Sequence, residues 1–146
     1  MSYNAYSGTY VPNNPNKYKG TKKIIWRSSW ELKFMKYCDR NPKIIEWVSE
    51  PFSIKYYLPT TGKWHKYYPD FLITSQNRQN ERQRTLIEIK PEHQTKPPKK
   101  GNKKRKTIIT EQKTWVMNQS KWKFAKEFCK RKGIIFRILT EKELLI

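Results

Sequence analysis

The sequence of 146 residues is poor in several residue types, and each shortage excludes a class of protein. Its two cysteines, Cys38 and Cys129, lie among apolar residues without a CxxC motif or a Cys/His cluster. We expect two buried free thiols, and neither a disulfide nor a zinc site. No hydrophobic run is long enough to cross a membrane, and residues 1–20 lack the apolar segment of a signal peptide. We therefore expect a protein that works in a cytoplasm and has no membrane partner.

Acidic residues are also scarce, since 12 Asp and Glu stand against 32 Lys and Arg, for a formal net charge of +20. So much positive charge repels itself in a compact fold unless a polyanion neutralises it. Nucleic acid is the expected partner. An anionic membrane surface fits less well, because the sequence has no long basic amphipathic helix and no lipidation signal. Aromatic residues make up 14% of the chain, enough large rings to build the core of one domain.

The first 23 residues are polar, contain several Asn and Pro, and show no periodicity. They predict an extended N-terminal arm, followed by a single domain over residues 24–146. The arm contains four tyrosines that are available to dock on a partner or on the domain itself: Tyr3, Tyr6, Tyr10 and Tyr18.

Capping and turn signals divide the domain. Residues 28–42 predict a helix that Ser28 caps and that Pro42 follows. Residues 43–73 predict two or three strands, with the TTG stretch at 60–62 as a turn. After a polar loop, the stretch TLIEIK predicts another strand, and the short spacings favour antiparallel hairpins.

The last third of the chain begins with a run of positively charged residues at 96–106. We expect a mobile basic loop at about 92–110, a second helix over 111–133 that ends at Gly133, and a final strand over 134–139. This order predicts an α/β fold with a mixed β-sheet core flanked by helices. Seven residues of the loop are expected to contact DNA phosphates: Lys96, Lys99, Lys100, Lys103, Lys104, Arg105 and Lys106.

Two strands of the core type carry charge: Asp70 lies in YYPDFLI, and Glu88 and Lys90 lie in TLIEIKP. Glu88 and Lys90 are two residues apart and point to the same face of a strand. If the strands are neighbours, Asp70 and Glu88 converge. Burying two carboxylates together is costly unless a cation compensates, and a hard divalent ion such as Mg²⁺ prefers oxygen ligands. The structural alternatives are a strand-end acid bonded to local backbone and a cross-strand ion pair.

Glu31 has two interpretations. It follows Ser28 by three residues, which is the S-x-x-E pattern of a capping box. It also shares a helix face with Phe34, Met35 and Cys38, so it is expected to point inward as a third carboxylate of the site.

The second helix offers further candidates beside the site. Asn118 continues the apolar stripe of this helix and Lys121 flanks it, so both are candidates to face the carboxylates, but a solvated helix turn is the favoured interpretation for both. Gln112 and Lys113 are weaker candidates of the same kind. His65 and His93 are expected at the surface.

The combination of Pro69-Asp70 and Glu88-Ile89-Lys90 on strands, after a helix that carries Glu31, resembles the PD-(D/E)XK nuclease superfamily. The order of the segments EWVSEPFSIKYY, YYPDFLI, LIEIKP and NQSKWKFAKEFCKRKGIIFRILTEKEL resembles the TnsA-type transposon endonucleases. The chain is more similar still to the family of head completion nucleases of T-even-like tailed bacteriophages, which begin with a similar AYSGTYVPNNPNKYKG arm.

This resemblance implies a restriction-endonuclease-like fold and a metal-dependent DNA endonuclease that processes or binds the end of packaged double-stranded DNA before the tail attaches. Its catalytic residues would be Glu31, Asp70, Glu88 and Lys90. Mg²⁺, with Mn²⁺ as a substitute, would bind Glu31, Asp70, Glu88 and the backbone carbonyl of Ile89.

The implied partners are double-stranded DNA and the portal or neck proteins of the phage head, with no small-molecule cofactor. The protein would be made in the host cytoplasm and end in the virion, at the head or the head–tail junction. Two alternatives remain open: a non-enzymatic basic plug of the head or neck that binds DNA, and a transposon- or restriction-type endonuclease.

Overall fold

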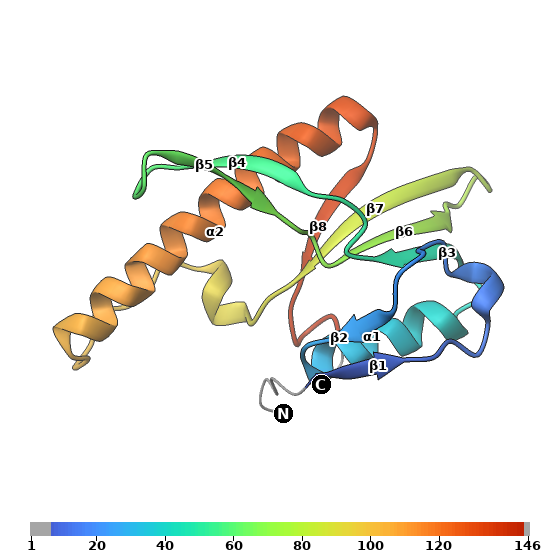
Figure 1. Ribbon diagram of the computed structural model, residues 1–146, viewed down its shortest axis with the longest axis horizontal. Helices are drawn as coiled ribbons and strands as arrows, with labels where there is room; N and C mark the ends of the chain where they lie inside the picture. Colours follow the sequence, from blue (N-terminus) through green and yellow to red (C-terminus); the bar gives the residue numbers. More distant parts are fainter. Residues whose placement is uncertain (1–6, 145–146) are drawn as a thin grey trace.

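The computed structural model describes residues 7–144, and its centre is a four-stranded sheet of order β3-β6-β7-β8 (Figure 1). The strands are β3 (Ile44–Ser49), β6 (Phe71–Gln76), β7 (Arg82–Ile89) and β8 (Ile135–Leu139). β3, β6 and β7 pair antiparallel, whereas β7 and β8 pair parallel. The predicted α/β class with a mixed sheet is confirmed, and so is the β6–β7 hairpin.

Two helices cover opposite faces of this sheet: α1 (Ser29–Arg40) and α2 (Arg105–Lys132). Alternate residues of β7 point to the two sides. Ile87 joins the α1 cluster, a set of buried side chains that includes Phe34 and Trp47. Leu86 joins the α2 cluster, whose members from the helix are Ala125 and Cys129.

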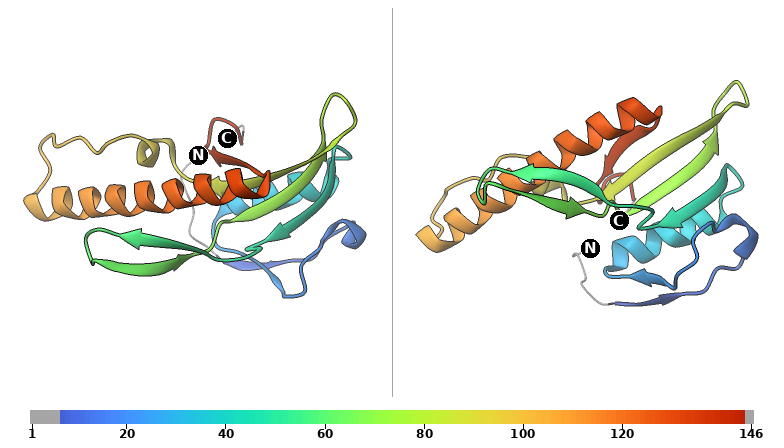
Figure 2. Two further views of the ribbon diagram at one scale, coloured as in Figure 1. Left: turned by 90° about the horizontal axis from the view of Figure 1, so that it is seen from above. Right: turned by 45° about the horizontal axis from the view of Figure 1, so that its top comes forward.

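A second hairpin, of β4 (Ile54–Leu58) and β5 (Lys63–Tyr67), forms its own two-stranded sheet and lies along α2 (Figure 2). The chain therefore has four strands between residues 43 and 73, and the prediction of two or three was wrong. The missed boundary lies between β5 and β6, where Pro69 has no backbone N–H to donate to a strand ladder. The predicted turn at 60–62 is confirmed.

The described part of the predicted arm packs on the domain. β1 (Gly8–Tyr10) pairs antiparallel with β2 (Ile24–Trp26), and the short 3-10 helix η1 (Pro15–Lys17) lies between them in the chain. Tyr18 packs edge-on against Trp47, with ring centroids 4.7 Å apart. Tyr10 and Tyr18 thus dock on the domain itself, and Tyr3 and Tyr6 lie outside the described residues.

Asp39 of α1 holds this segment. Its buried carboxylate accepts hydrogen bonds from the Tyr10 hydroxyl at 2.6 Å and from the backbone amides of Asn13 at 2.7 Å and Asn14 at 2.9 Å. Burial raises the pKa of the Asp39 carboxyl, but these hydrogen bonds outweigh burial and leave the pKa below its usual value of 3.8. The carboxylate is therefore the charged acceptor that joins residues 10–14 to the domain.

α2 begins at Arg105, earlier than the predicted start at residue 111. The predicted basic loop of residues 92–110 is correspondingly shorter, and Arg105 and Lys106 lie on the helix. Lys and Arg are good helix formers, so a run of positive charge alone does not predict a loop. Residues Glu92–Thr95 form a further 3-10 helix, η2.

The helix ends and the cysteines agree with the sequence. The Ser28 side chain caps α1 by accepting from the Glu31 amide at 3.1 Å, and Gly133 ends α2 in the left-handed conformation, with φ of 68°. Cys38 and Cys129 are buried free thiols. Among residues 7–144, no helix has the length and apolar character needed to cross a membrane.

Replacing Asp39 by Asn should lower the free energy of unfolding by about 1–3 kcal/mol, because an amide cannot accept all three hydrogen bonds and leaves buried donors unpaired. Urea unfolding at neutral pH measures this. The exposed substitution Glu127→Gln on α2 is the control and should change stability little.

The pH dependence of this loss follows from the lowered pKa of Asp39. The contribution of the carboxylate is present above the unfolded-state pKa of about 3.9 and is lost as pH falls through the lower folded-state pKa. The difference between wild type and Asp39→Asn should therefore shrink in acid. A difference that is absent at neutral pH would contradict this role of Asp39.

Candidate active site

The register of the β6–β7 pair brings two carboxylates together. Phe71 pairs with Ile87, so Asp70, which directly precedes β6, lies opposite Glu88. The Asp70 Oδ2 atom accepts a hydrogen bond from the Ile89 amide at 2.7 Å. Glu88 is buried, with 4% of its surface exposed. The predicted convergence of Asp70 and Glu88 is thus present in the structure.

The pair is electrostatically strained. The pKa of Asp70 lies well above its usual value of 3.8. The largest cause is burial, which disfavours the charged form, and the second is the nearby Glu88. The Ile89 amide and the Lys90 charge lower the pKa but do not offset these effects. Tyr67, at the end of β5, donates a hydrogen bond from its hydroxyl to Glu88 Oε2. Burial and the Glu88 charge together raise the pKa of Tyr67, so its hydroxyl remains a donor.

Tyr67 was not predicted as a site residue. The alternation of β5 indicates that its ring points inward, toward the α2 cluster. Its contact with Glu88, however, depends on how the β4–β5 hairpin folds over β7, and the local sequence carries no signal for that arrangement.

Two lysines lie beside the carboxylates. Lys90 follows Glu88 by two residues and so extends the same face of the chain. Lys121 of α2 lies near Lys90, Glu88 and Asp70. Burial and then the Lys90 charge lower the pKa of Lys121 from the usual 10.5, although the two carboxylates act to raise it. The Lys121 Nζ atom is 5.5 Å from the centroid of the Tyr67 ring. The structure therefore places Lys121 near the carboxylate pair, partly buried and not on a fully solvated helix turn.

Glu31 reaches Asp70 from the α1 side and remains in its capping geometry. Its carboxylate accepts from Ser28 Oγ at 3.2 Å and from the Arg27 amide at 3.4 Å. Burial and then the Asp70 charge raise the pKa of Glu31 to about 7. The capping role is confirmed, and Glu31 lies close enough to Asp70 for the two charges to interact.

Within residues 7–144, no three or more His, Cys, Asp or Glu side chains gather closely enough to hold a metal ion. Glu31 does not complete such a group because it comes from α1, on the other side of the sheet, and its carboxylate is turned back to Ser28. The site therefore consists of the Asp70–Glu88 pair, with Glu31 nearby.

The other candidates on α2 lie in different environments. Asn118 is buried, with 1% of its surface exposed, and it lines a cavity between α2 and the basic segment. Gln112 and Lys113 are exposed on earlier turns of the helix, and the structure does not bring them to the carboxylates. His93 is exposed, and His65 is partly exposed and shares a 2.9 Å hydrogen bond with Thr61 Oγ1, in agreement with the surface positions predicted for both.

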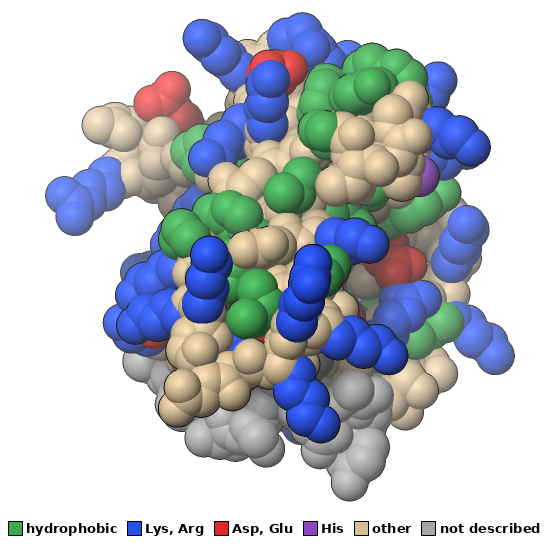
Figure 3. Space-filling model, turned by 90° about the vertical axis from the view of Figure 1, so that its left-hand side faces the viewer, with side chains coloured by type: hydrophobic (Ala, Val, Ile, Leu, Met, Phe, Trp, Pro, Cys, Tyr) green, Lys and Arg blue, Asp and Glu red, His purple; other side chains and the backbone are tan. Residues whose placement is uncertain are grey.

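The seven basic residues predicted to contact DNA are all exposed, and Lys and Arg side chains cover much of this end of the molecule (Figure 3). Two of them form ion pairs: Lys96 with Glu92 at 3.1 Å, and Lys103 with Glu111 at 3.0 Å. The other five have no ion pair among the described residues and are the stronger candidates for phosphate contacts: Lys99, Lys100, Lys104, Arg105 and Lys106.

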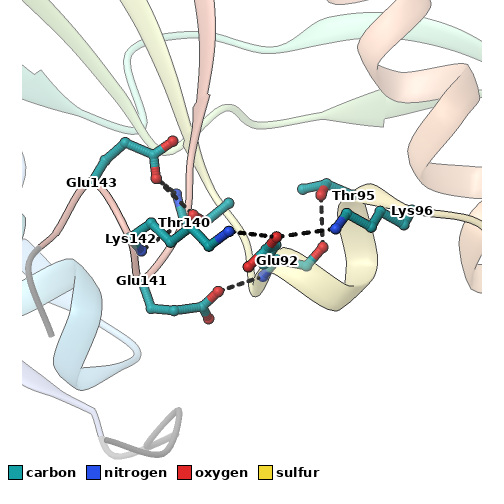
Figure 4. A network of polar contacts seen from close by, with 7 residues as sticks. All are labelled: Glu92, Thr95, Lys96, Thr140, Glu141, Lys142 and Glu143. Carbon is teal, nitrogen blue, oxygen red and sulfur yellow. Dashed lines mark hydrogen bonds and ion pairs between the residues drawn. The ribbon is translucent and has the colours of Figure 1, made fainter.

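A polar network joins the start of the basic segment to the turn after β8 (Figure 4). The Glu92 amide donates to Glu141 Oε1 at 2.9 Å, and Lys142 Nζ lies 3.0 Å from Glu92 Oε1. Thr140 donates to Glu143 Oε2 from its hydroxyl at 2.6 Å. Because Glu92 follows Lys90 by only two residues, this network fixes the chain directly beyond the site.

The fold agrees with the comparisons. A family model described as TnsA-like endonuclease N terminal matches residues 41–141, and the chain belongs to this family of endonucleases, which is of the PD-(D/E)XK type with a restriction-endonuclease-like fold. The chain is also 41% identical over 145 residues to the "Head completion nuclease" of Enterobacteria phage T4, with 96% of this chain and 94% of that protein covered. Both resemblances predicted from the sequence are confirmed. The matched residues of the family model begin after α1, so they do not include Glu31.

Replacing Glu31 by Gln should separate its two roles, because Gln can still accept the hydrogen bonds of the cap but carries no charge. If Glu31 supports a metal ion held by Asp70 and Glu88, DNA cleavage should fall roughly 10- to 100-fold. Unfolding free energy in acid should change by less than about 0.5 kcal/mol. Single-turnover cleavage and urea unfolding measure the two effects.

The raised pKa of Glu31 adds a pH signature in buffer without divalent ions. Because the folded state holds the proton more tightly, wild type should lose stability as pH rises from 4.5 through about 7. Glu31→Gln should show a smaller loss, because only the contribution of Asp70, whose pKa is also raised, remains. Wild-type cleavage by the variant would show that Glu31 is only a cap.

The five basic residues without ion pairs should supply affinity for DNA and no chemistry. Changing all five to Gln should flatten the plot of log affinity against log salt by about 0.9 for each phosphate that the variant no longer neutralises. Fluorescence anisotropy across a salt series measures this. Single-turnover cleavage at saturating protein and low salt should persist.

A variant of matched charge, with five exposed basic residues outside this segment changed to Gln, controls for the loss of net charge. These five are Lys22, Lys23, Lys36, Arg40 and Lys43. It should leave the slope nearly unchanged. If the first variant has the wild-type slope, the basic segment faces a protein partner and not DNA.

Proposed function

We propose that this protein is a divalent-metal-dependent DNA endonuclease that acts in completion of the phage head and processes the end of packaged double-stranded DNA before the tail attaches. One observation carries the proposal: the half-buried Asp70 carboxylate lies opposite the buried Glu88, with Lys90 and Lys121 beside the pair. The endonuclease family and the name of the phage relative support the DNA substrate and the place in phage assembly.

The residues of the site fit a hard divalent ion. Burial and the nearby Glu88 carboxylate disfavour the charged form of Asp70 and raise its pKa. A bound cation would offset both effects. Mg²⁺ is commonly bound by one or two carboxylates, with water and substrate phosphate as its other ligands. Asp70 and Glu88 would hold Mg²⁺ or Mn²⁺, assisted by the Ile89 carbonyl and by Glu31. When bound, the ion would supply Lewis acidity toward the scissile phosphate and a nucleophile at neutral pH.

The chain's own groups complete the chemistry. The Ile89 amide and the Tyr67 hydroxyl fix the two carboxylates by donating hydrogen bonds to them. Lys90 would orient the attacking water and stabilise the charge that develops on the phosphate oxygens. The lowered pKa of Lys121 makes this amine a candidate to assist the same proton transfers or to contact the phosphate.

The proposed setting is the host cell during assembly and then the virion, at the head or the head–tail junction. Portal or neck proteins are the proposed partners there, since a DNA end that leaves the head passes through them. Two other functions make different predictions: a basic plug would bind DNA without cutting it, and a transposon- or restriction-type endonuclease would cut with sequence preference.

Asp70→Asn and Glu88→Gln should each abolish cleavage of linear and supercoiled duplex in Mg²⁺ or Mn²⁺, because each removes one charged oxygen ligand. In EDTA both variants should melt at higher temperature than wild type, since the repulsion between the carboxylates is gone. Gel assays of cleavage and thermal melting measure the two effects.

Glu81→Gln, in the exposed turn between β6 and β7, is the control and should behave as wild type in both assays. Cleavage that persists in both site variants would refute the site. Wild-type protein that binds DNA but cuts none in Mg²⁺ or Mn²⁺ would favour the plug.

A further inference from the structure

A cavity of about 530 Å³ lies between the basic segment and the first half of α2. Residues 92–94 and 96–99 and Lys103 form one wall, and Trp115 and Asn118 line the other. Its volume is in the range of cavities that bind small organic molecules. Neither the carboxylates nor the lysines of the active site line it, so the chemistry proposed above does not use it.

A lining residue of the cavity, Asn118, has an unused hydrogen-bond donor. The Nδ2 atom of Asn118 is buried and has no hydrogen-bond partner among the described residues. A buried amide without a partner costs stability, so such a group usually has a partner that the protein chain does not supply. Trp115, one turn earlier on the helix, is partly buried and lines the same cavity. An aromatic ring beside a donor matches a flat heterocycle that carries acceptors at its edge.

The position of the cavity relates it to the active site. Asn118 precedes Lys121 by one helical turn, and Lys121 lies beside the carboxylates. On the other wall, Glu92 follows Lys90 by two residues. A group in the cavity would therefore be a near neighbour of a phosphate held at Asp70 and Glu88.

The charge around the cavity favours an anionic ligand over a neutral apolar one, and the aromatic ring of Trp115 favours a nucleotide among anionic ligands. The two acidic residues of its lining, Glu92 and Glu111, are both paired with lysines. Lys99 lines the cavity without an ion pair among residues 7–144, and further lysines surround it on the same end of the molecule (Figure 3). Single-stranded nucleic acid is bound by this combination of aromatic rings and positive charge.

We propose that this cavity binds an unpaired nucleotide of the DNA substrate, with the base stacked on Trp115 and its edge hydrogen-bonded to Asn118. The inference rests on the proposed nuclease function and adds a substrate class: the protein prefers DNA whose strand is unpaired next to the cut. The unpaired nucleotide comes from a frayed end or from a base displaced out of the duplex.

Binding in EDTA tests the proposal without cleavage. Fluorescence anisotropy compares a blunt duplex, the same duplex with a short single-stranded overhang, and one with an unpaired internal nucleotide. Wild type should bind at least one of the two DNAs with unpaired bases roughly 5- to 100-fold more tightly than the blunt duplex. The DNA with the greater gain identifies the source of the nucleotide.

Trp115→Ala should lose most of this preference, and Trp115→Phe should keep most of it. Asn118→Leu should weaken binding of the unpaired DNAs with little change in melting temperature, because it removes a buried N–H donor that has no partner among the described residues. Gln119→Ala, an exposed neighbour on α2, is the matched control and should bind like wild type.

Equal affinity of wild type for all three DNAs, or an unchanged preference in Trp115→Ala, would overturn the proposal. If Trp115→Ala does not fold, photo-cross-linking of wild type to an overhang that carries 5-iodouracil decides, with the adduct expected at Trp115. A preference for unpaired DNA without metal-dependent cleavage would refute the nuclease function alone. Cleavage without the preference would refute this inference alone.

Discussion

The repulsion between Asp70 and Glu88 is the constraint on which the arrangement of the protein depends. The two carboxylates lie opposite each other because Phe71 pairs with Ile87, and both of these side chains are buried in the α1 cluster. A slip of one residue would move these side chains out of the core, so hydrophobic burial holds the register that the charges oppose. Packing on one face of the sheet thereby keeps the other face chemically reactive.

The two faces consequently differ in composition. On the α1 side, Trp47 and Phe71 pack with the helix, and Asp39 joins the segment of residues 10–14 through hydrogen bonds to its carboxylate. On the α2 side, the polar groups of Tyr67 and Lys121 lie within the packing of the hairpin and the helix. Changes on the first side should act mainly on stability, and changes on the second side mainly on activity.

The parts that the sequence predicted are those with a local signal. The cap at Ser28, the end of α2 at Gly133 and the pairing of the strands that carry Asp70 and Glu88 each follow from a short pattern. Tyr67 and the Asn118 cavity were missed because they depend on how the β4–β5 hairpin and α2 pack over the sheet. The start of α2 was predicted too late because the run of positive charge was interpreted as a loop, although Lys and Arg are good helix formers.

The parallel pairing of β7 with β8 has a consequence for how this enzyme type can diversify. The crossover between the two strands contains the basic segment and α2, and the Glu92–Glu141 hydrogen bond closes it at its base. Lengthening a flexible segment between fixed ends costs little free energy, because closure entropy grows only with the logarithm of length. Insertions, deletions or new charge patterns around residues 97–104 should therefore change the stability of the sheet little. The charge and length of this segment can therefore change while the carboxylate pair on β7 and before β6 stays in place.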